Sequence, residues 1–250
     1  MAKMAKRPNF KIVKATSTNK WLPPLWRKST FPVLRQPAKS LKDITGTAFL
    51  LSYNKQDFIV TASHVIEMKN PVLMFSKKNN QSTDKESVLV SSDDLHQIGL
   101  DWTKHPAGLD LAAIPFCTES LQRDLDVFLL AEDKWTFRPF SVNDEIVHLG
   151  YPDKGTSNCD GSPWVFPQGM PGNIIHVNSF DFNMKTSGVH GASGGPVFLK
   201  TKENKPHLIG VVTETELLGY ITKALCISLV KDILDTDAMK GQLMKLEKFR

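Results

Sequence analysis

The chain has 250 residues, of which 41% are hydrophobic and 23% charged, enough for one large domain or two small ones with a full hydrophobic core. No run approaches the roughly 18 uncharged apolar residues of a membrane-spanning helix, so no transmembrane segment is expected. Lysine and arginine interrupt every apolar run in the first thirty residues. This pattern excludes the hydrophobic region of a secretory signal peptide, although an organelle transit segment stays open.

The formal net charge of +5 is unevenly distributed. Residues 1–42 contain eleven Lys or Arg and no acid, and Asp43 is the first acidic residue. Because the whole chain has 31 basic and 26 acidic residues, residues 43–250 carry 20 and 26, a net charge of −6. A basic arm of this kind fits a nucleic acid, an anionic membrane or an acidic partner, and it also fits packing against its own acidic body.

The cysteines are few and odd in number. Their spacing matches no zinc pattern, and an unpaired, sparse set is typical of a reducing compartment. We therefore expect three buried thiols in a cytoplasmic protein with no metal and no cofactor. The three are Cys117, Cys159 and Cys226.

From about residue 44 the chain reads as short apolar segments separated by turn residues. Residues 44–53 and 58–62 flank a turn over residues 54–56, which predicts a β-hairpin. Helical periodicity appears only near the end, where Ser228 is a plausible N-cap for residues 229–234 and a second helix spans 238–249. Residues 152–172 predict a long surface loop. Further strands are expected at 72–76, 87–90, 111–116, 145–149, 173–177, 196–200 and 208–213, so the fold class is all-β.

Three local motifs carry side chains with catalytic chemistry. The first is TASHVI at 61–66, a histidine directly after an apolar strand; the second is HPAGLDLAAI at 105–114, an acid that opens another strand. The third is GASGGPVF at 191–198, a serine in a glycine-rich turn before a strand. Each motif alone is common, but the order His, Asp, Ser in one chain is much less often accidental. The candidate residues are His64, Asp110 and Ser193.

These motifs resemble those of the trypsin-like (chymotrypsin-fold) serine peptidases, closest to the HtrA-like and bacterial trypsin-like branch. Residues 144–152 resemble the strand and Gly-x-Pro turn that begin the second barrel of that family, and residues 224–231 resemble its last strand and C-terminal helix. The resemblance covers roughly residues 43–236. It implies two antiparallel six-stranded β-barrels with a C-terminal helix, and a catalytic triad in the cleft between the barrels.

The resemblance also implies a domain division and a set of roles. We expect a basic arm at 1–42, an N-terminal barrel at 43–136, a C-terminal barrel at 137–227 and a helical segment at 228–250. In the family's mechanism His64 acts as base, Asp110 orients the imidazole and Ser193 attacks the peptide carbonyl. The backbone N–H groups of Gly191 and Ser193 would form the oxyanion hole. Ala192 stands where digestive proteases have an Asp that pairs with a newly cut N-terminus, so activation of that kind is not expected.

Substrate preference follows from alignment to the nucleophile. Ser187 stands where trypsin has an acid, so cleavage after Lys or Arg is not expected, and Thr215 stands where a glycine would leave the S1 pocket open. With Gly188, these residues resemble the elastase-like pockets that accept small apolar P1 side chains. Protein or peptide is therefore the expected substrate, with strand addition at the pocket edge. The substrate-binding residues are expected to be Ser187, Gly188, His190, Thr213, Glu214 and Thr215.

The same residues bear on three other interpretations. An α/β-hydrolase requires the order Ser, acid, His, but after Ser193 only His207 follows, with Glu203 as the one acid between them. A trypsin-fold binding module without proteolytic activity stays open, because a blocked cleft leaves no trace in sequence. A nucleic-acid binder that acts through residues 1–42 stays open as well.

Overall fold

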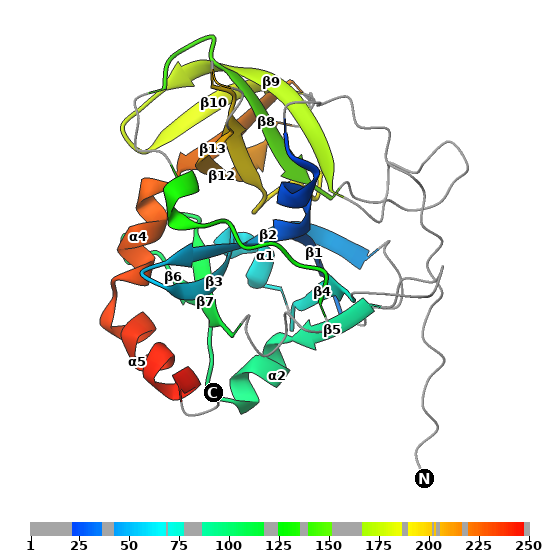
Figure 1. The fold of residues 1–250 in the computed structure, drawn as a ribbon, viewed down its shortest axis with the longest axis vertical. Coiled ribbons are helices and arrows are strands. Elements are labelled where there is room, and N and C mark those ends of the chain that lie inside the picture. Colours follow the sequence, from blue (N-terminus) through cyan, green and yellow to red (C-terminus); the bar gives the residue numbers. More distant parts are fainter. Residues whose placement is uncertain are drawn as a thin grey trace, which may run out of the picture.

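Two antiparallel β-structures, one from each half of the chain, make up the computed structural model (Figure 1). The structure describes residues 22–36, 43–68, 70–77, 87–117, 125–135, 140–151, 167–186, 190–201, 203, 206–216 and 220–247. The expected all-β class with a C-terminal helical segment is confirmed. The predicted surface loop at 152–172 lies mostly outside the described residues, but its last part is already strand.

The N-terminal half is a seven-stranded antiparallel sheet in the described part of the chain, rather than the six-stranded barrel that was expected. Its strand order is β5-β4-β1-β2-β3-β7-β6. Asn54 and Lys55 turn the predicted hairpin with φ values of 50° and 62°, as a tight two-residue turn requires. The strands are β1 (Thr30–Leu34), β2 (Ile44–Tyr53), β3 (Gln56–Thr61), β4 (Val72–Ser76), β5 (Ser87–Ser91), β6 (Thr103–Lys104) and β7 (Ala112–Phe116).

Strand β2 is apolar along most of its length because both of its faces are buried. Phe49 and Leu51 belong to a core shared with the C-terminal half, whereas Ala48 and Leu50 belong to the core of the N-terminal half. Alternate side chains of a strand point to opposite faces, so one strand serves both cores. The N-terminal sheet is thereby held against the second half by its central strand.

The C-terminal half is a closed six-stranded barrel with the order β10-β13-β12-β11-β8-β9, as expected for this half. Its interior is filled by apolar side chains such as Phe182, Val197 and Ile209, all buried. The strands are β8 (Glu145–Gly150), β9 (Gln168–Val177), β10 (Asp181–Thr186), β11 (Pro196–Leu199), β12 (His207–Thr215) and β13 (Ile221–Cys226).

The helices differ in part from the sequence prediction. Helix α2 (Ser92–Gln97) was missed, although Ser91 and Asp94 form a capping box at its start. Helix α4 (Ser228–Leu234) was predicted, but the expected cap was wrong, because Ile227 precedes the helix and no side chain caps it. Helix α5 (Asp237–Leu246) follows and packs beside β7 of the N-terminal sheet. The short helices α1 (Ser63–Ile66), η1 (Pro24–Ser29) and η3 (Glu132–Lys134) complete the set.

The later part of the basic arm is built into the fold. Trp26 of η1 is buried and lies edge-on to Phe198 of the C-terminal barrel, with ring centroids 5.0 Å apart. Residues 30–34 then form β1, which pairs with β2 along its whole length and with β4 only at Val33 and Leu34. Residues 22–34 therefore belong to the folded body rather than to a separate arm. Residues 1–21 and 37–42 lie outside the described residues.

Two general features of the described residues bear on the sequence expectations. None of their helices has the length and apolar character needed to cross a membrane. Neither Cys117 nor Cys226 forms a disulfide, both are partly rather than fully buried, and burial raises the pKa of Cys226 to about 11. Cys159 lies outside the described residues.

Candidate active site

His64 and Asp110 meet because two neighbouring strands end at the same place. Strand β3 pairs with β7 in antiparallel register, with Thr61 opposite Ala112. The chain leaves β3 into helix α1, whose second residue is His64, and Asp110 lies just before β7. Antiparallel pairing thus places the end of β3 beside the start of β7, and the two side chains follow.

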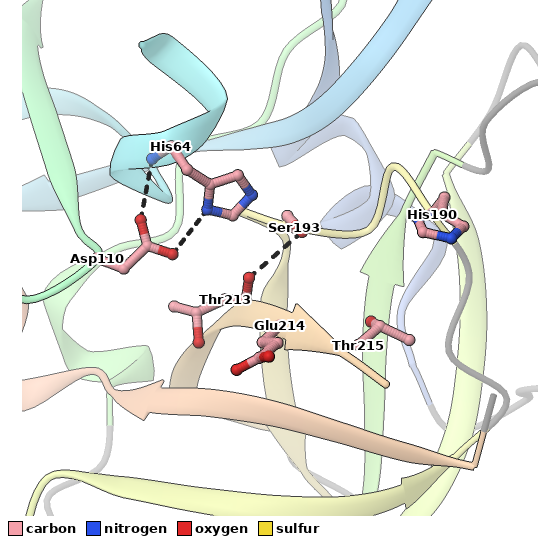
Figure 2. A pocket seen from close by; sticks show the side chains of 7 residues that line it. All are labelled: His64, Asp110, His190, Ser193, Thr213, Glu214 and Thr215. Atoms are coloured by element: carbon pink, nitrogen blue, oxygen red, sulfur yellow. Dashed lines mark hydrogen bonds and ion pairs between the residues drawn. The ribbon is translucent and has the colours of Figure 1, made fainter. Parts of the chain in front are cut away.

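The Asp110 carboxylate is held by three hydrogen bonds from two consecutive residues. Its Oδ2 lies 2.7 Å from His64 Nδ1, and its Oδ1 accepts the His64 backbone N–H at 2.9 Å (Figure 2). The hydroxyl of Ser63 also donates to Oδ1, at 2.7 Å. An imidazole bonded to a carboxylate through Nδ1 presents its Nε2 on the opposite side, as a base must.

These bonds shift both ionisation equilibria. The hydrogen bond to Asp110 raises the pKa of His64 above its usual 6.5, and partial burial opposes this rise. Burial raises the pKa of Asp110, but the hydrogen bonds from the His64 side chain, the His64 backbone and Ser63 outweigh it and hold that pKa below its usual value. The pair therefore favours a charged carboxylate beside an imidazole that accepts a proton readily.

Ser193 lies in a tight turn over residues 191–195, the nucleophile turn, which leads into β11. Gly191 and Gly194 have φ values of 92° and 85°, a region open mainly to glycine. The Gly194 N–H donates to Val212 O at 2.7 Å, and the Gly195 N–H donates to Ala192 O at 2.9 Å. A side chain at Gly194 would collide with the Thr47 carbonyl, and one at Gly195 with the Leu149 carbonyl, so the glycine pattern is required here.

The Ser193 hydroxyl rests against Thr213 rather than His64. It donates to the Thr213 carbonyl at 3.4 Å, a long hydrogen bond for a hydroxyl, and it is not hydrogen-bonded to His64 (Figure 2). The side chains of His64 and Ser193 nevertheless line the same pocket. Catalytic hydrogen bonds are often long or poorly aligned without substrate, and a rotation about the Ser193 Cα–Cβ bond turns its hydroxyl to a new partner.

A pocket of about 340 Å³ lies at the junction of the two halves (Figure 2). Ser187 and Gly188, two of the predicted substrate-binding residues, lie outside the described residues. In the described part of the chain, no group of three His, Cys, Asp or Glu side chains is arranged to hold a metal ion. The pocket is lined by His64, Asp110, His190, Ser193, Thr213, Glu214 and Thr215.

The two N–H groups predicted for the oxyanion hole belong to Gly191 and Ser193. Neither makes a hydrogen bond to a described residue, although the neighbouring N–H groups of Gly194 and Gly195 both do. Both groups can therefore donate to a bound oxygen.

Ser63 is a site residue that the sequence analysis missed. It is 9% exposed, and its hydroxyl contacts the carboxylate of Asp110, 47 residues away. The one signal in the sequence is a hydroxyl residue immediately before the histidine. The sequence alone does not show that this hydroxyl contacts Asp110, because the contact depends on the pairing of β3 with β7.

Comparisons with known proteins place the fold. No protein-family model and no curated protein matches the chain. Among solved structures, the serine endoprotease from Yersinia pestis matches with a TM-score of 0.58 at 14% identity, over 91% of this chain and 68% of that one. The active form of the Rv3671c protease from M. tuberculosis matches with a TM-score of 0.53 at 14% identity, over 94% and 92%. The chain has the chymotrypsin fold of the trypsin-like serine proteases.

One of the matching structures of this fold is named for binding rather than for proteolysis. Human heparin binding protein matches with a TM-score of 0.54 at 12% identity, over 86% of this chain and 92% of that one. A fold shared at such identities does not fix an activity, so the function has to be argued from the residues of the pocket.

Proposed function

We propose that the chain is a serine endopeptidase that hydrolyses peptide bonds with His64, Asp110 and Ser193. The observation that carries the proposal is the 2.7 Å contact between His64 Nδ1 and Asp110 Oδ2 beside Ser193, on one pocket. The shifted pKa values of both groups have a specific cause in this pair, as is usual for groups that do chemistry.

In the acylation step, the Ser193 hydroxyl leaves the Thr213 carbonyl and turns to His64. His64 Nε2 takes the hydroxyl proton while Oγ bonds to the carbonyl carbon of the scissile peptide. The resulting imidazolium is stabilised by the Asp110 carboxylate, which stays ionised because its pKa is low. When the tetrahedral intermediate collapses, the C–N bond breaks, the imidazolium gives its proton to the leaving amine, and an acyl ester remains on Ser193.

In the deacylation step, water replaces the amine. His64 takes a proton from the water as its oxygen bonds to the ester carbon, and the C–O bond to Ser193 then breaks. The proton returns to Ser193 Oγ, and the product carboxylic acid is released. In both steps negative charge builds on the carbonyl oxygen, where the N–H groups of Gly191 and Ser193 would donate.

The substrate is proposed to bind as an added strand along β12. Strand β11 pairs with β12 only as far as Val211, whereas β13 remains paired through Thr215. The β11-facing edge of Thr213 to Thr215 therefore has no strand partner among the described residues, and these residues line the pocket. An extended peptide can hydrogen-bond to such an edge, so protein or peptide is the proposed substrate class.

The preferred P1 residue is proposed to be small and apolar. Thr215 is opposite Thr222 in the β12–β13 pairing, so two β-branched side chains stand side by side next to the pocket. Such side chains narrow the space available to a large P1 group. A digest of a peptide library would show Ala or Val at P1, and a product set dominated by Phe, Glu or Arg would contradict this preference.

The decisive experiment is covalent labelling with a fluorophosphonate probe, with casein hydrolysis measured in parallel. Wild type should label and hydrolyse casein, whereas Ser193→Ala should do neither. His64→Ala and Asp110→Asn should slow both reactions by several orders of magnitude. Wild-type protein that is folded yet neither labels nor hydrolyses any protein would end the proposal.

A second candidate is a binding module without proteolytic activity. Two observations favour it: the resting hydroxyl of Ser193 points to Thr213, and residues 1–42 contain eleven basic residues and no acid. A basic arm attracts polyanions or acidic proteins, and a protein of this fold is named for heparin binding. Deletion of residues 1–21, before η1 and β1, tests this candidate without damaging the sheet, and unchanged polyanion affinity would exclude a role for residues 1–21.

A further inference from the structure

Thr47 connects the N-terminal sheet to the nucleophile turn of the other half. It lies on β2, it is fully buried, and Gly191 is 144 residues away in sequence. Thr47 is absent from the pocket lining, so it does not touch substrate. Its contacts nevertheless end on the turn that carries Ser193.

Two hydrogen bonds from Thr47 hold the first and the middle residue of the turn. The Thr47 N–H donates to the Ser193 carbonyl at 2.8 Å, and its hydroxyl donates to the Gly191 carbonyl at 2.6 Å. The same hydroxyl accepts the Tyr151 N–H at 3.0 Å, which fixes its orientation. Because the Thr47 hydroxyl already accepts the Tyr151 N–H, its single proton is directed at the Gly191 carbonyl.

These contacts determine which groups of the turn remain available. The carbonyls of Gly191 and Ser193 are held by Thr47, and the Ala192 carbonyl between them is held by the Gly195 N–H. In a planar trans peptide the C=O and the following N–H point in opposite directions. The Ser193 N–H shares a peptide with the Ala192 carbonyl, so it points away from Gly195, and Thr47 holds the carbonyl of the next peptide on each side. The Gly191 N–H belongs to the preceding peptide, so Thr47 restrains it through the backbone of Gly191 itself.

We propose that Thr47 is a positioning residue that sets the oxyanion-binding conformation of the nucleophile turn from the opposite half of the molecule. This inference rests on the proposed peptidase activity. It makes the oxyanion site dependent on the contact between the two halves, since the hydroxyl comes from β2 and the turn belongs to the C-terminal barrel.

The test is Thr47→Val, which exchanges the hydroxyl for a methyl group of similar size. The Gly191 carbonyl loses its partner, so the backbone between the two oxyanion N–H groups is less restrained, and Ser193 acylation should slow by about 10- to 100-fold, the scale expected for a displaced catalytic group. KM should stay within about twofold, because the change acts on the transition state. Affinity for a peptide boronic acid, which mimics the tetrahedral intermediate, should fall by the same factor as kcat, a loss that lowered stability alone does not cause.

Thr45→Val is the matched control. Thr45 lies two residues earlier on β2, and its hydroxyl donates to the Val33 carbonyl at 3.1 Å inside the N-terminal sheet. This variant removes a similar hydrogen bond without touching the turn, so kcat and boronic acid affinity should be unchanged. Thr47→Ser keeps the hydroxyl and should restore kcat to within a few-fold of wild type.

Hydrogen exchange of a peptide that covers residues 190–196 supplies a readout independent of activity. Exchange should be faster in Thr47→Val than in wild type and unchanged in Thr45→Val. If wild type proves inactive, the peptidase proposal fails while this comparison still tests Thr47. If Thr47→Val does not fold, Thr47→Ala leaves room for a water molecule and takes its place. Equal acylation rates, or equal exchange in all folded variants, would overturn the inference.

Discussion

The Ser63 hydroxyl and the Asp110 carboxylate are joined by a 2.7 Å hydrogen bond across 47 residues of sequence. Thr213 also lines the pocket, but its hydroxyl donates to the Lys223 carbonyl at 3.5 Å instead. Ser63 therefore supplies the one side-chain hydroxyl that orients Asp110 among the described residues. Together with the His64 backbone, it leaves Oδ2 to the imidazole.

Ser63→Ala should lower kcat by about 10-fold with KM nearly unchanged. A hydrogen bond to a charged group is worth roughly 1.5–3 kcal/mol, and water can replace part of it because Asp110 is about a third exposed. Steady-state kinetics on a peptide ester measure the change. Ser29→Ala, which removes a 2.7 Å hydrogen bond to the Trp26 carbonyl away from the pocket, is the control and should leave kcat as it is. A wild-type kcat in Ser63→Ala would mean that Asp110 does not depend on this bond.

The pH dependence of kcat/KM should follow His64. Activity requires the neutral imidazole, so kcat/KM should rise with pH as His64 loses its proton. Because the hydrogen bond to Asp110 raises the pKa of His64, the midpoint of this rise should lie above 6.5. In Asp110→Asn the midpoint should move to lower pH, and the rate should fall by about 10⁴-fold. Measurements of kcat/KM from about pH 5 to pH 9 test both statements; a midpoint that does not respond to Asp110→Asn would remove His64 from the role of base.

His148 should make the fold sensitive to acid. It is fully buried on β8, its Nε2 is 3.3 Å from the Thr186 hydroxyl, and burial lowers its pKa from 6.5 to about 4. Between these two values the unfolded chain binds a proton that the folded chain does not, so stability falls as the pH falls through this window. The loss is on the order of 3 kcal/mol by pH 4.

Urea denaturation at several pH values measures this contribution. In His148→Gln the side chain can still hydrogen-bond to Thr186 but no longer titrates, so the free energy of unfolding should fall less between pH 6.5 and about 4 than in wild type. The same slope in both proteins would assign the acid sensitivity to other groups.

Gly194→Ala should destabilise the fold by more than about 3 kcal/mol and abolish labelling of Ser193, because it combines backbone strain with a collision. Its φ is 85°, and the added methyl group would meet the carbonyl of Thr47 and the hydroxyl of Thr61. Gly108→Ala is the matched control: φ is 72°, but nothing lies within 4 Å of the added atom, so only about 1 kcal/mol of strain is expected. If urea denaturation shows the same loss of unfolding free energy in both variants, crowding at Gly194 does not contribute to the destabilisation.

Much of the fold could be predicted because alternating and apolar segments define strands locally. Strand β4 was predicted at its observed bounds, and β2 likewise, since both have buried, β-branched or aromatic residues between turn signals. Strand β1 was missed because Pro32 and the surrounding basic residues resemble an unstructured arm. The structure accommodates Pro32 where β1 pairs with β2 alone, since β4 joins only at Val33 and Leu34.

Some residues of the candidate site could be predicted from the sequence and others could not. The motifs around His64, Asp110 and Ser193 could be read from sequence because each side chain stands at a strand end or in a glycine turn. Ser63 and Thr47 could not, since their partners lie 47 and 144 residues away and depend on strand register and on the contact between halves. No local pattern distinguishes a threonine that holds the nucleophile turn from any other buried threonine in a strand.

Helix α5 returns the chain to the half where it began. Met239 and Leu246 of this helix are buried, and Leu246 belongs to the core of the N-terminal sheet. Gln242 accepts the Asp101 N–H at 2.8 Å and donates to the Thr103 hydroxyl at 2.9 Å. During synthesis the first half therefore completes its core only after residues 237–246 have left the ribosome, so its sheet stays partly uncovered while the whole C-terminal barrel is being made.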